Sequence, residues 1–153
     1  MTSSTDRIER EIQLKATRAR VWRALSNAEE FGNWFGVDLK GKVFESGKHV
    51  EGKITHPGYE HLNWKVRIEL MVPEHLLSFR WHPYAINPAI DYSKEPSTLV
   101  EFTMKDAAGG TLLSLAESGF DTIPASRRAD AFRMNSSGWD QQMTNIEKHV
   151  ATP

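Results

Sequence analysis

A long amphipathic helix near the C-terminal end places the strongest constraint on the fold of this chain. The pattern runs from Pro124 to Val150, and apolar or small residues recur along it in steps of four and three. These residues are Ala125, Ala129, Phe132, Ser136, Trp139, Met143, Ile146 and Val150. Because such spacing puts all eight side chains on one stripe, we expect that stripe to pack against the rest of the domain.

The middle of this predicted helix contains residues that form helices poorly. Asn135, Ser136, Ser137 and Gly138 follow one another, and glycine in a helix costs about 1 kcal/mol relative to alanine. Trp139, which carries the largest side chain available, comes next. A hollow beside this stretch would explain why the helix keeps it, whereas an ordinary packed helix explains the periodicity equally well.

Length and composition are typical of one soluble globular domain. The chain has 153 residues, of which 39% are hydrophobic and 25% charged, and we expect one domain over residues 1–153 with a mobile tail at residues 1–7. No stretch approaches the roughly 18 apolar residues that span a bilayer. Residues 1–10 lack the apolar segment of a secretory signal, so we expect a cytoplasmic protein.

Charge and cysteine content argue against several functional classes. Nineteen basic and twenty acidic residues leave a formal net charge of −1, which gives no electrostatic footprint for nucleic acid or an anionic membrane. The absence of cysteine excludes disulfides, thiol nucleophiles, structural zinc held by thiolates and cysteine-ligated iron–sulfur clusters. The six histidines include no His-x-x-x-His pair on a helix, and no glycine-rich loop precedes a helix. We therefore expect no metal and no cofactor.

The first part of the chain predicts a strand followed by two short helices. Ile8, Ile12 and Leu14 alternate with polar residues, although Arg10 interrupts the apolar face. Thr17 is the predicted N-cap of the first short helix. The second short helix is expected to begin near residue 27, to carry Phe31, Trp34 and Phe35, and to end at Gly36.

The region between these helices and the long helix is typical of an antiparallel sheet. Apolar and polar residues alternate in segments separated by turn residues, which indicates a sheet with one covered face. The predicted strands are 37–44, 48–56, 61–72, 76–82, 98–105 and 111–119. The last two strands are joined by a hairpin at 106–110, where glycines supply the positive φ angles that a tight turn needs.

A fourteen-residue connection at 83–96 breaks this rhythm with three prolines. Connections of this length in compact domains are often lids or binding loops. It carries four large apolar side chains, Tyr84, Ile86, Ile90 and Tyr92. These side chains suit the mouth of a site, and they equally suit a loop that is pinned to the surface.

Five tryptophans in so small a chain are the strongest compositional signal for a ligand site. Large aromatic side chains with a few polar groups suit either a ligand cavity or a core, and both interpretations stay open for Trp34, Trp81 and Trp139. His82 lies at the mouth of the long connection, near Asp91 in sequence. This pair is the best available candidate for general acid–base catalysis if the fold brings the two side chains together.

Several local motifs resemble one known family. They are Ala19–Leu25, Phe31–Trp34, Pro73–Trp81, Gly110–Phe120 and Asn135–Trp139. Through these motifs, and through its order of elements, the chain resembles the bacterial branch of the activator of heat-shock-protein-90 ATPase homologue-like family. That family lies within the START and birch-pollen-allergen superfamily. The resemblance implies an α+β helix-grip fold, in which a curved antiparallel sheet of about six to seven strands wraps the C-terminal helix and two short helices follow the first strand.

The resemblance also implies a cavity between the sheet and the long helix, where apolar ligands bind. Carried over by position, its walls include Trp34, Trp81, Phe132, Ser136 and Trp139, with Tyr84 and Tyr92 at the entrance. A polar end of the ligand would be oriented by Ser136, Asn135 or His82. The leading hypothesis is therefore the non-enzymatic binding of a small hydrophobic or aromatic molecule.

Two further functions remain as alternatives. One is an enzyme of the polyketide-cyclase-like type that uses His82 and Asp91 inside the cavity. The other is an interaction module for a chaperone or another protein, which should show an exposed apolar or charged patch. Eukaryotic members of the family carry an asparagine- and tryptophan-rich motif near the N-terminus. This chain begins Met-Thr-Ser-Ser-Thr-Asp-Arg instead, which argues against stimulation of a chaperone.

Overall fold

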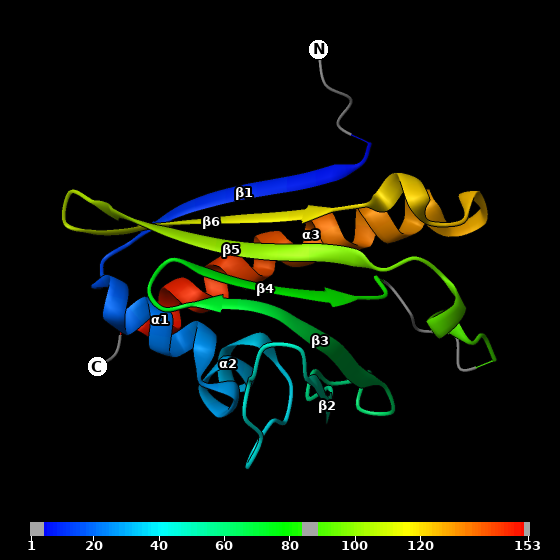
Figure 1. Cartoon of the computed structure of the whole chain (residues 1–153), viewed down its shortest axis with the longest axis horizontal. Coiled ribbons are helices and arrows are strands. Elements are labelled where there is room, and N and C mark those ends of the chain that lie inside the picture. Colours follow the sequence, from blue (N-terminus) through cyan, green and yellow to red (C-terminus); the bar gives the residue numbers. More distant parts are fainter. Residues whose placement is uncertain (1–4, 84–88, 152–153) are drawn as a thin grey trace.

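A six-stranded antiparallel sheet curves around a long helix, α3 (Ala125–Val150), in the computed structural model of the chain (Figure 1). The structure describes residues 5–83 and 89–151. The strands lie in the order β1-β6-β5-β4-β3-β2. Their bounds are β1 Arg7–Leu14, β2 His49–Lys53, β3 Asn63–Val72, β4 Leu76–Trp81, β5 Thr98–Ala107 and β6 Gly110–Ser118. This arrangement confirms the α+β helix-grip fold.

Two short helices, α1 (Arg18–Ser26) and α2 (Ala28–Phe35), pack beside the C-terminal part of α3 (Figure 1). Thr17 caps α1, because its side-chain oxygen accepts a hydrogen bond from the backbone N–H of Arg20. Asn27 caps α2 in the same way. Gly36 ends α2 in the left-handed conformation, with a φ angle of +98°, which glycine adopts without a steric penalty.

The inner face of the sheet forms most of the core. The predicted alternation holds in β5, in β6 and in β3 up to Ile68, where every second residue points towards α3 and is buried. The inner side chains include Trp64, Val66 and Ile68 of β3, Val100, Phe102 and Met104 of β5, and Leu113 and Leu115 of β6. The hairpin between β5 and β6 also forms as predicted, with Gly109 at a φ angle of +80°.

The prediction of a strand at residues 37–44 is wrong. Val37 forms an isolated bridge with Ile54, after which the chain turns and the backbone N–H of Lys42 donates to the carbonyl of Leu39. Val37, Leu39 and Phe44 are nevertheless buried. Their apolar spacing therefore anchors a loop to the core instead of forming a ladder of strand hydrogen bonds.

The buried stripe of α3 differs from the predicted stripe in the first half of the helix. Trp139, Met143, Ile146 and Val150 are buried as expected. Further upstream, Ala125 and Ala129 are exposed and Ala131 is buried in their place. The side chains that face the sheet are spaced four residues apart, at positions 131, 135, 139 and 143. Residues four apart lie on nearly the same face of a helix, since four residues are slightly more than one turn. Asn135 therefore faces the sheet.

Part of the predicted mobile tail makes defined contacts. Thr5 donates a hydrogen bond to the Asp121 carboxylate over 2.9 Å, and the Asp6 carboxylate accepts one from the backbone N–H of Asp121 over 3.0 Å. Arg7 is the first residue of β1. Residues 1–4 lie outside the described residues. Within the described chain, no helix has the length and apolar character needed to cross a bilayer.

Candidate ligand-binding site

A buried carboxylate lies between the sheet and α3. Glu117, near the end of β6, has none of its surface exposed. Its Oε1 accepts hydrogen bonds from Asn135 Nδ2 over 2.9 Å and from Trp139 Nε1 over 2.8 Å. Its Oε2 accepts from Trp81 Nε1 over 2.7 Å and from Thr98 Oγ1 over 2.6 Å. We call these five residues the Glu117 network.

The sheet register and the helix periodicity bring the network together. Glu117 continues the inward alternation of β6, two residues beyond Leu115. Trp81 at the end of β4 pairs directly with Thr98 at the start of β5, so both reach the same side of Glu117. On α3, residues 135 and 139 are four apart, and their side chains therefore approach the carboxylate from the same helix face.

The hydrogen bonds to Glu117 come from neutral groups alone. Indole and carboxamide N–H groups only donate, so they match a carboxylate that offers about four lone-pair positions. Within the residues that the structure describes, no Lys, Arg or His pairs with Glu117. The burial of this carboxylate is therefore offset by hydrogen bonds without an ion pair.

Aromatic rings surround the network and fill the space between the sheet and α3. The ring centre of Trp139 lies 5.7 Å from that of Trp81, 6.0 Å from Phe35 and 5.8 Å from Phe102. Trp139 is 2% exposed, so almost none of its surface is accessible to water. Trp81 and Phe35 are only half-buried, and their rings lie 6.1 Å apart. They form the accessible side of the aromatic cluster.

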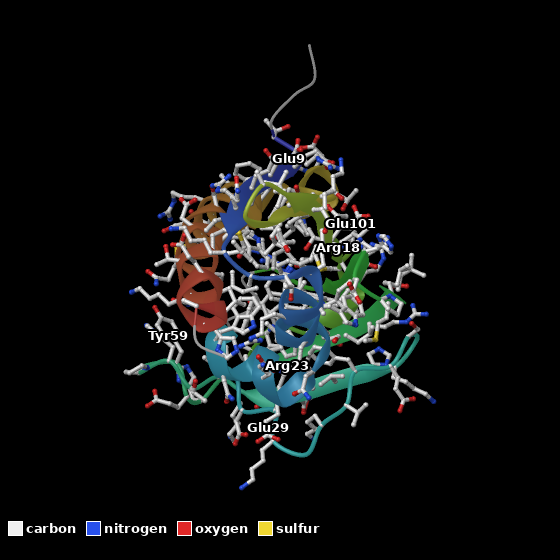
Figure 2. All side chains as sticks on the ribbon, turned by 90° about the vertical axis from the view of Figure 1, so that its left-hand side faces the viewer. Glu9, Arg18, Arg23, Glu29, Tyr59 and Glu101 are labelled. Carbon is white, nitrogen blue, oxygen red and sulfur yellow. The ribbon has the colours of Figure 1, made fainter. Side chains whose placement is uncertain are left out.

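Two shallow hollows that described residues line lie away from this cluster. One, of about 470 Å³, is beside β2 and is lined mainly by charged residues such as Lys40, Lys42 and Glu51. The other, of about 450 Å³, lies on the outer face of β1, β6 and β5. Figure 2 shows Glu9 and Glu101, which border the second hollow, pointing away from the interior. Both hollows are open and polar, unlike the apolar cavities that hold small ligands.

Trp34 and Phe132, two of the predicted wall residues, lie outside the Glu117 network. The indole Nε1 of Trp34 donates to the carbonyl of Ala24 over 2.8 Å and so ties α2 to α1. Phe132 is half-buried, with its ring 5.1 Å from that of Phe120.

Ser136 is turned towards β1. Its hydroxyl accepts a hydrogen bond from Arg10 Nη2 over 2.7 Å, and Arg10 Nε lies 2.6 Å from the Asp140 carboxylate. Arg10, which interrupted the apolar pattern of the first strand, therefore faces α3 and has polar partners there. The Ser136 hydroxyl joins β1 to α3.

The connection between β4 and β5 is fastened to the first turns of α3. Arg127 Nη2 lies 2.7 Å from Glu95 Oε1, and its Nη1 donates to the carbonyl of Pro83 over 2.8 Å. The same guanidinium lies over the ring of Tyr92, 4.8 Å from its centre. Tyr92 is half-buried in a 3-10 turn, Tyr92–Lys94. Tyr84, the other predicted entrance residue, lies outside the described residues.

His82 and Asp91 are not joined by a hydrogen bond in the part of the chain that the structure describes. His82 Nε2 lies 3.1 Å from the carbonyl oxygen of Glu95. Asp91 is exposed and accepts hydrogen bonds from the Ser93 hydroxyl and backbone N–H. These bonds, with a smaller contribution from the charge of His82, hold the pKa of Asp91 below its usual range. The predicted acid–base pair is not assembled in this geometry.

Glu117, Thr98 and Phe35 belong to this region although the sequence pattern did not indicate them as site residues. The available signal was the alternation of β6, because Leu113 and Leu115 point inwards and Glu117 is next in the same series. An acid at an inward position requires partners. Those partners come from three other elements and depend on the tertiary fold.

A family model described as Activator of Hsp90 ATPase homolog 1-like protein matches residues 15–151. The chain belongs to this family. Several solved structures have a similar fold. One is protein MLL2253 from Mesorhizobium loti, with 23% sequence identity and a TM-score of 0.72. The match covers 95% of this chain and 96% of that chain. Protein NE0264 from Nitrosomonas europaea has 15% identity and a TM-score of 0.73, with coverage of 99% and 97%.

A third similar structure is DynU16, described as a putative protein in the dynemicin biosynthetic locus. It has 18% identity and a TM-score of 0.72, and the match covers 96% of this chain and 48% of that chain. The chain thus spans about half the length of DynU16. No protein of curated function matches the sequence. At these identities the structural likeness establishes the fold of this family member and leaves its ligand to be inferred from its own residues.

Proposed function

We propose that the protein binds a small aromatic molecule, without chemical turnover, on the accessible side of Trp81 and Phe35 beside the Glu117 network. START-like folds of this family commonly bind hydrophobic ligands. The observation that carries the proposal is the buried Glu117 carboxylate among aromatic rings. Removing a carboxylate from water costs several kcal/mol, and a well-packed apolar core of similar volume is often more stable. Stability alone would favour an apolar side chain at position 117, so the presence of Glu117 there supports a functional role for this carboxylate.

The packing indicates where a ligand would enter. Trp139 is fully packed, so the half-buried rings of Trp81 and Phe35 are the groups that a ligand would reach. Phe35 is the last residue of α2, and its carbonyl accepts a hydrogen bond from Gln142 over 2.8 Å. The backbone of Phe35 is thereby held, and its ring stacks on that of Phe31 with 4.8 Å between the ring centres. A planar ligand would stack on the accessible part of Trp81, beside the Phe35 ring.

Calorimetric titration with two matched neutral compounds tests this proposal. 2-Naphthalenemethanol offers a planar aromatic face, and its fully saturated decalin counterpart has a similar size without that face. We expect the aromatic compound to bind more tightly, because stacked aromatic pairs contribute about 0.5–1.5 kcal/mol beyond area burial. Trp81→Leu should weaken its binding by about tenfold, which corresponds to about 1.4 kcal/mol.

The matched control is Trp22→Leu, which changes a half-buried tryptophan on α1 that makes no ring contact with Trp81, Trp139 or Phe35. This variant should keep the affinity of the parent protein. The proposal fails if no neutral aromatic compound gives a saturable signal, or if the Trp22 and Trp81 variants lose affinity equally.

An acid–base enzyme is the second candidate function, and Glu117 favours it because this is a titratable group inside the aromatic cluster. All of the acceptor positions of Glu117 are occupied by donors, so a proton could reach it only after one donor moved away. Cyclisation of a poly-β-ketone model compound, followed by mass spectrometry, distinguishes the two functions. Turnover that Glu117→Gln abolishes would favour the enzyme, and unchanged compound favours the binder.

An interaction with a protein partner is favoured by a separate feature, on the outer face of β3. Leu70 and Val72 lie two residues apart there and are 54% and 42% exposed. Exposed apolar side chains in adjacent positions are typical of contact surfaces. A partner that the parent protein captures and a Leu70→Lys variant does not would support this function.

A further inference from the structure

We infer that Glu117 determines the charge of the ligand, so that the site takes a neutral or cationic aromatic molecule, preferably with an amino group, and rejects anionic ones. This inference rests on the proposed function and specifies its ligand class. A cavity built only from apolar rings would accept the ring system of a carboxylic acid as readily as that of an amine. The buried carboxylate of Glu117 makes the site favour the amine over the carboxylic acid.

Among residues 5–83 and 89–151, no cationic side chain forms an ion pair with Glu117. All of its hydrogen-bond donors are neutral groups, and it is completely buried. Two arginines next to the same part of the fold carry carboxylates of their own, since Arg10 pairs with Asp140 and Arg127 pairs with Glu95. A ligand anion beside Trp81 would therefore meet an uncompensated negative charge at low effective dielectric.

Asn135 occupies the place that a ligand amino group would take. Its Nδ2 lies 2.9 Å from Oε1 and 3.1 Å from Oε2 of Glu117, so one N–H donor group bridges both carboxylate oxygens. The side chain is half-buried, whereas Trp139 on the next turn is packed on all sides. Of the four donors, Asn135 combines partial exposure with a small, flexible side chain. An amine that displaces its amide would hydrogen-bond to both oxygens.

The aromatic rings add to the preference for a cation. Trp81 and Trp139 are 5.7 Å apart with an angle of 33° between their planes, and Phe35 lies about 6 Å from both. Ring faces attract ammonium groups through the negative potential of their π systems. The Glu117 carboxylate and the aromatic rings therefore both favour a positively charged ligand.

A series of three naphthalene compounds tests the inference by calorimetry at pH 7 and low salt. 2-Naphthylmethylamine is cationic, 2-naphthalenemethanol neutral and 2-naphthoate anionic. We expect the amine to bind at least as tightly as the alcohol and about a hundredfold more tightly than the acid, because like charges a few ångströms apart repel strongly at a partly buried site. Glu117→Gln should reduce the difference between amine and acid to less than about threefold.

Two helix variants provide a test that does not depend on replacing Glu117. Asn135→Ala removes the one donor that bridges both carboxylate oxygens and should raise the affinity ratio of amine to alcohol by about fivefold, which reflects one charge-assisted hydrogen bond. Ser137→Ala, at an exposed position of the same helix, should leave this ratio unchanged.

The outcomes separate this inference from the proposed function. Equal binding of the amine and the acid to the parent protein would overturn the inference while leaving aromatic binding intact. An unchanged ratio of amine to alcohol in Asn135→Ala would also overturn it, whether or not Glu117→Gln folds. If none of the three compounds binds, the proposed function itself fails.

Discussion

Trp139 Nε1 donates a hydrogen bond of 2.8 Å to Glu117 Oε1, which fixes the largest side chain of α3 to a completely buried acid of the sheet. This bond explains why the helix places a tryptophan at this turn. The indole fills the space over β5 and β6 and at the same time supplies a donor that the carboxylate requires. The Glu117 network is therefore both a packing device and the polar centre of the proposed site.

Glu117→Ala should destabilise the protein by about 3 to 5 kcal/mol. The substitution leaves the donors of Trp81, Trp139, Asn135 and Thr98 without their acceptor in a buried setting, which costs more than the loss of the hydrogen bonds themselves. Urea denaturation followed by circular dichroism measures the change. Glu101→Ala, on the outer face of β5, is the control and should cost less than about 0.5 kcal/mol. A loss below about 1 kcal/mol for Glu117→Ala would contradict the account.

Gly138→Ala should stabilise the protein by about 1 kcal/mol. Gly138 lies in α3, and a Cβ added there would meet no atom within 4 Å, so alanine gains helix propensity without a clash. Gly32→Ala in α2 is the matched comparison, because its Cβ would lie 2.2 Å from the carbonyl oxygen of Val37 and must destabilise. Thermal unfolding of both variants measures the two shifts. A lowered melting temperature for Gly138→Ala would show that the helix needs glycine at this position.

Glu30 should contribute to the free energy of unfolding at neutral pH, and this contribution should be lost at acid pH. Its carboxylate contacts Arg20, Arg23 and His149, and so joins α1 and α2 to the end of α3. Burial acts to raise the pKa of Glu30, but hydrogen bonds from His149 and Arg20 and the charges of both arginines outweigh burial and hold the pKa below its usual range.

A lowered folded-state pKa means that the stabilisation is complete above the ordinary glutamate pKa of about 4.3 and is lost as the pH falls through the folded value. Glu30→Gln should therefore cost about 1.5 kcal/mol at pH 7, and the difference from the parent protein should shrink as the pH falls below about 4. Urea unfolding at several pH values checks this. A difference that is constant down to pH 3 would refute the ion-pair explanation.

Arg127→Ala should loosen the connection that precedes β5. The guanidinium contacts Glu95, the carbonyl of Pro83 and the ring of Tyr92, so one side chain fastens three points of this connection to α3. Hydrogen exchange at the Glu95 amide, which donates to the carbonyl of Tyr92, should become at least about tenfold faster. Arg127→Lys should restore little of this protection, because an ammonium lacks the forked geometry. Unchanged exchange in Arg127→Ala would contradict this role.

Local signals in the sequence predicted most of the secondary structure correctly. Thr17 caps the first short helix as predicted, and the inward series of β5, and of β3 as far as Ile68, follows the period of two. These features depend on neighbouring residues alone. Beyond Ile68 a shift in the pairing of β3 with β4 turns Leu70 and Val72 to the outer face. The strand at 37–44 was wrong because buried apolar residues also anchor loops, and the spacing of Val37 and Leu39 does not distinguish the two cases.

The site was harder to predict, because its partners come from distant parts of the chain. Trp81, Asn135 and Trp139 were among the candidate ligand-binding residues, yet their shared acceptor, Glu117, was not. The predicted helical stripe included Ser136 and left out Asn135, but Arg10 of β1 binds the Ser136 hydroxyl and Asn135 reaches Glu117. The choice between these neighbours depends on the angle at which α3 crosses the sheet, which the sequence pattern does not define.

Ligand binding beside the Glu117 network is tested most directly by the response of the five tryptophan indole N–H resonances to 2-naphthylmethylamine, recorded in a nitrogen-15 spectrum. Single Trp→Phe variants assign the resonances. Binding beside the Glu117 network should shift the Trp81 and Trp139 signals in a saturable way and leave Trp22 unchanged, because the first two N–H groups donate to Glu117 and Trp22 lies on α1. Unmoved Trp81 and Trp139 signals at saturating amine, or equal shifts of all five, would contradict the account.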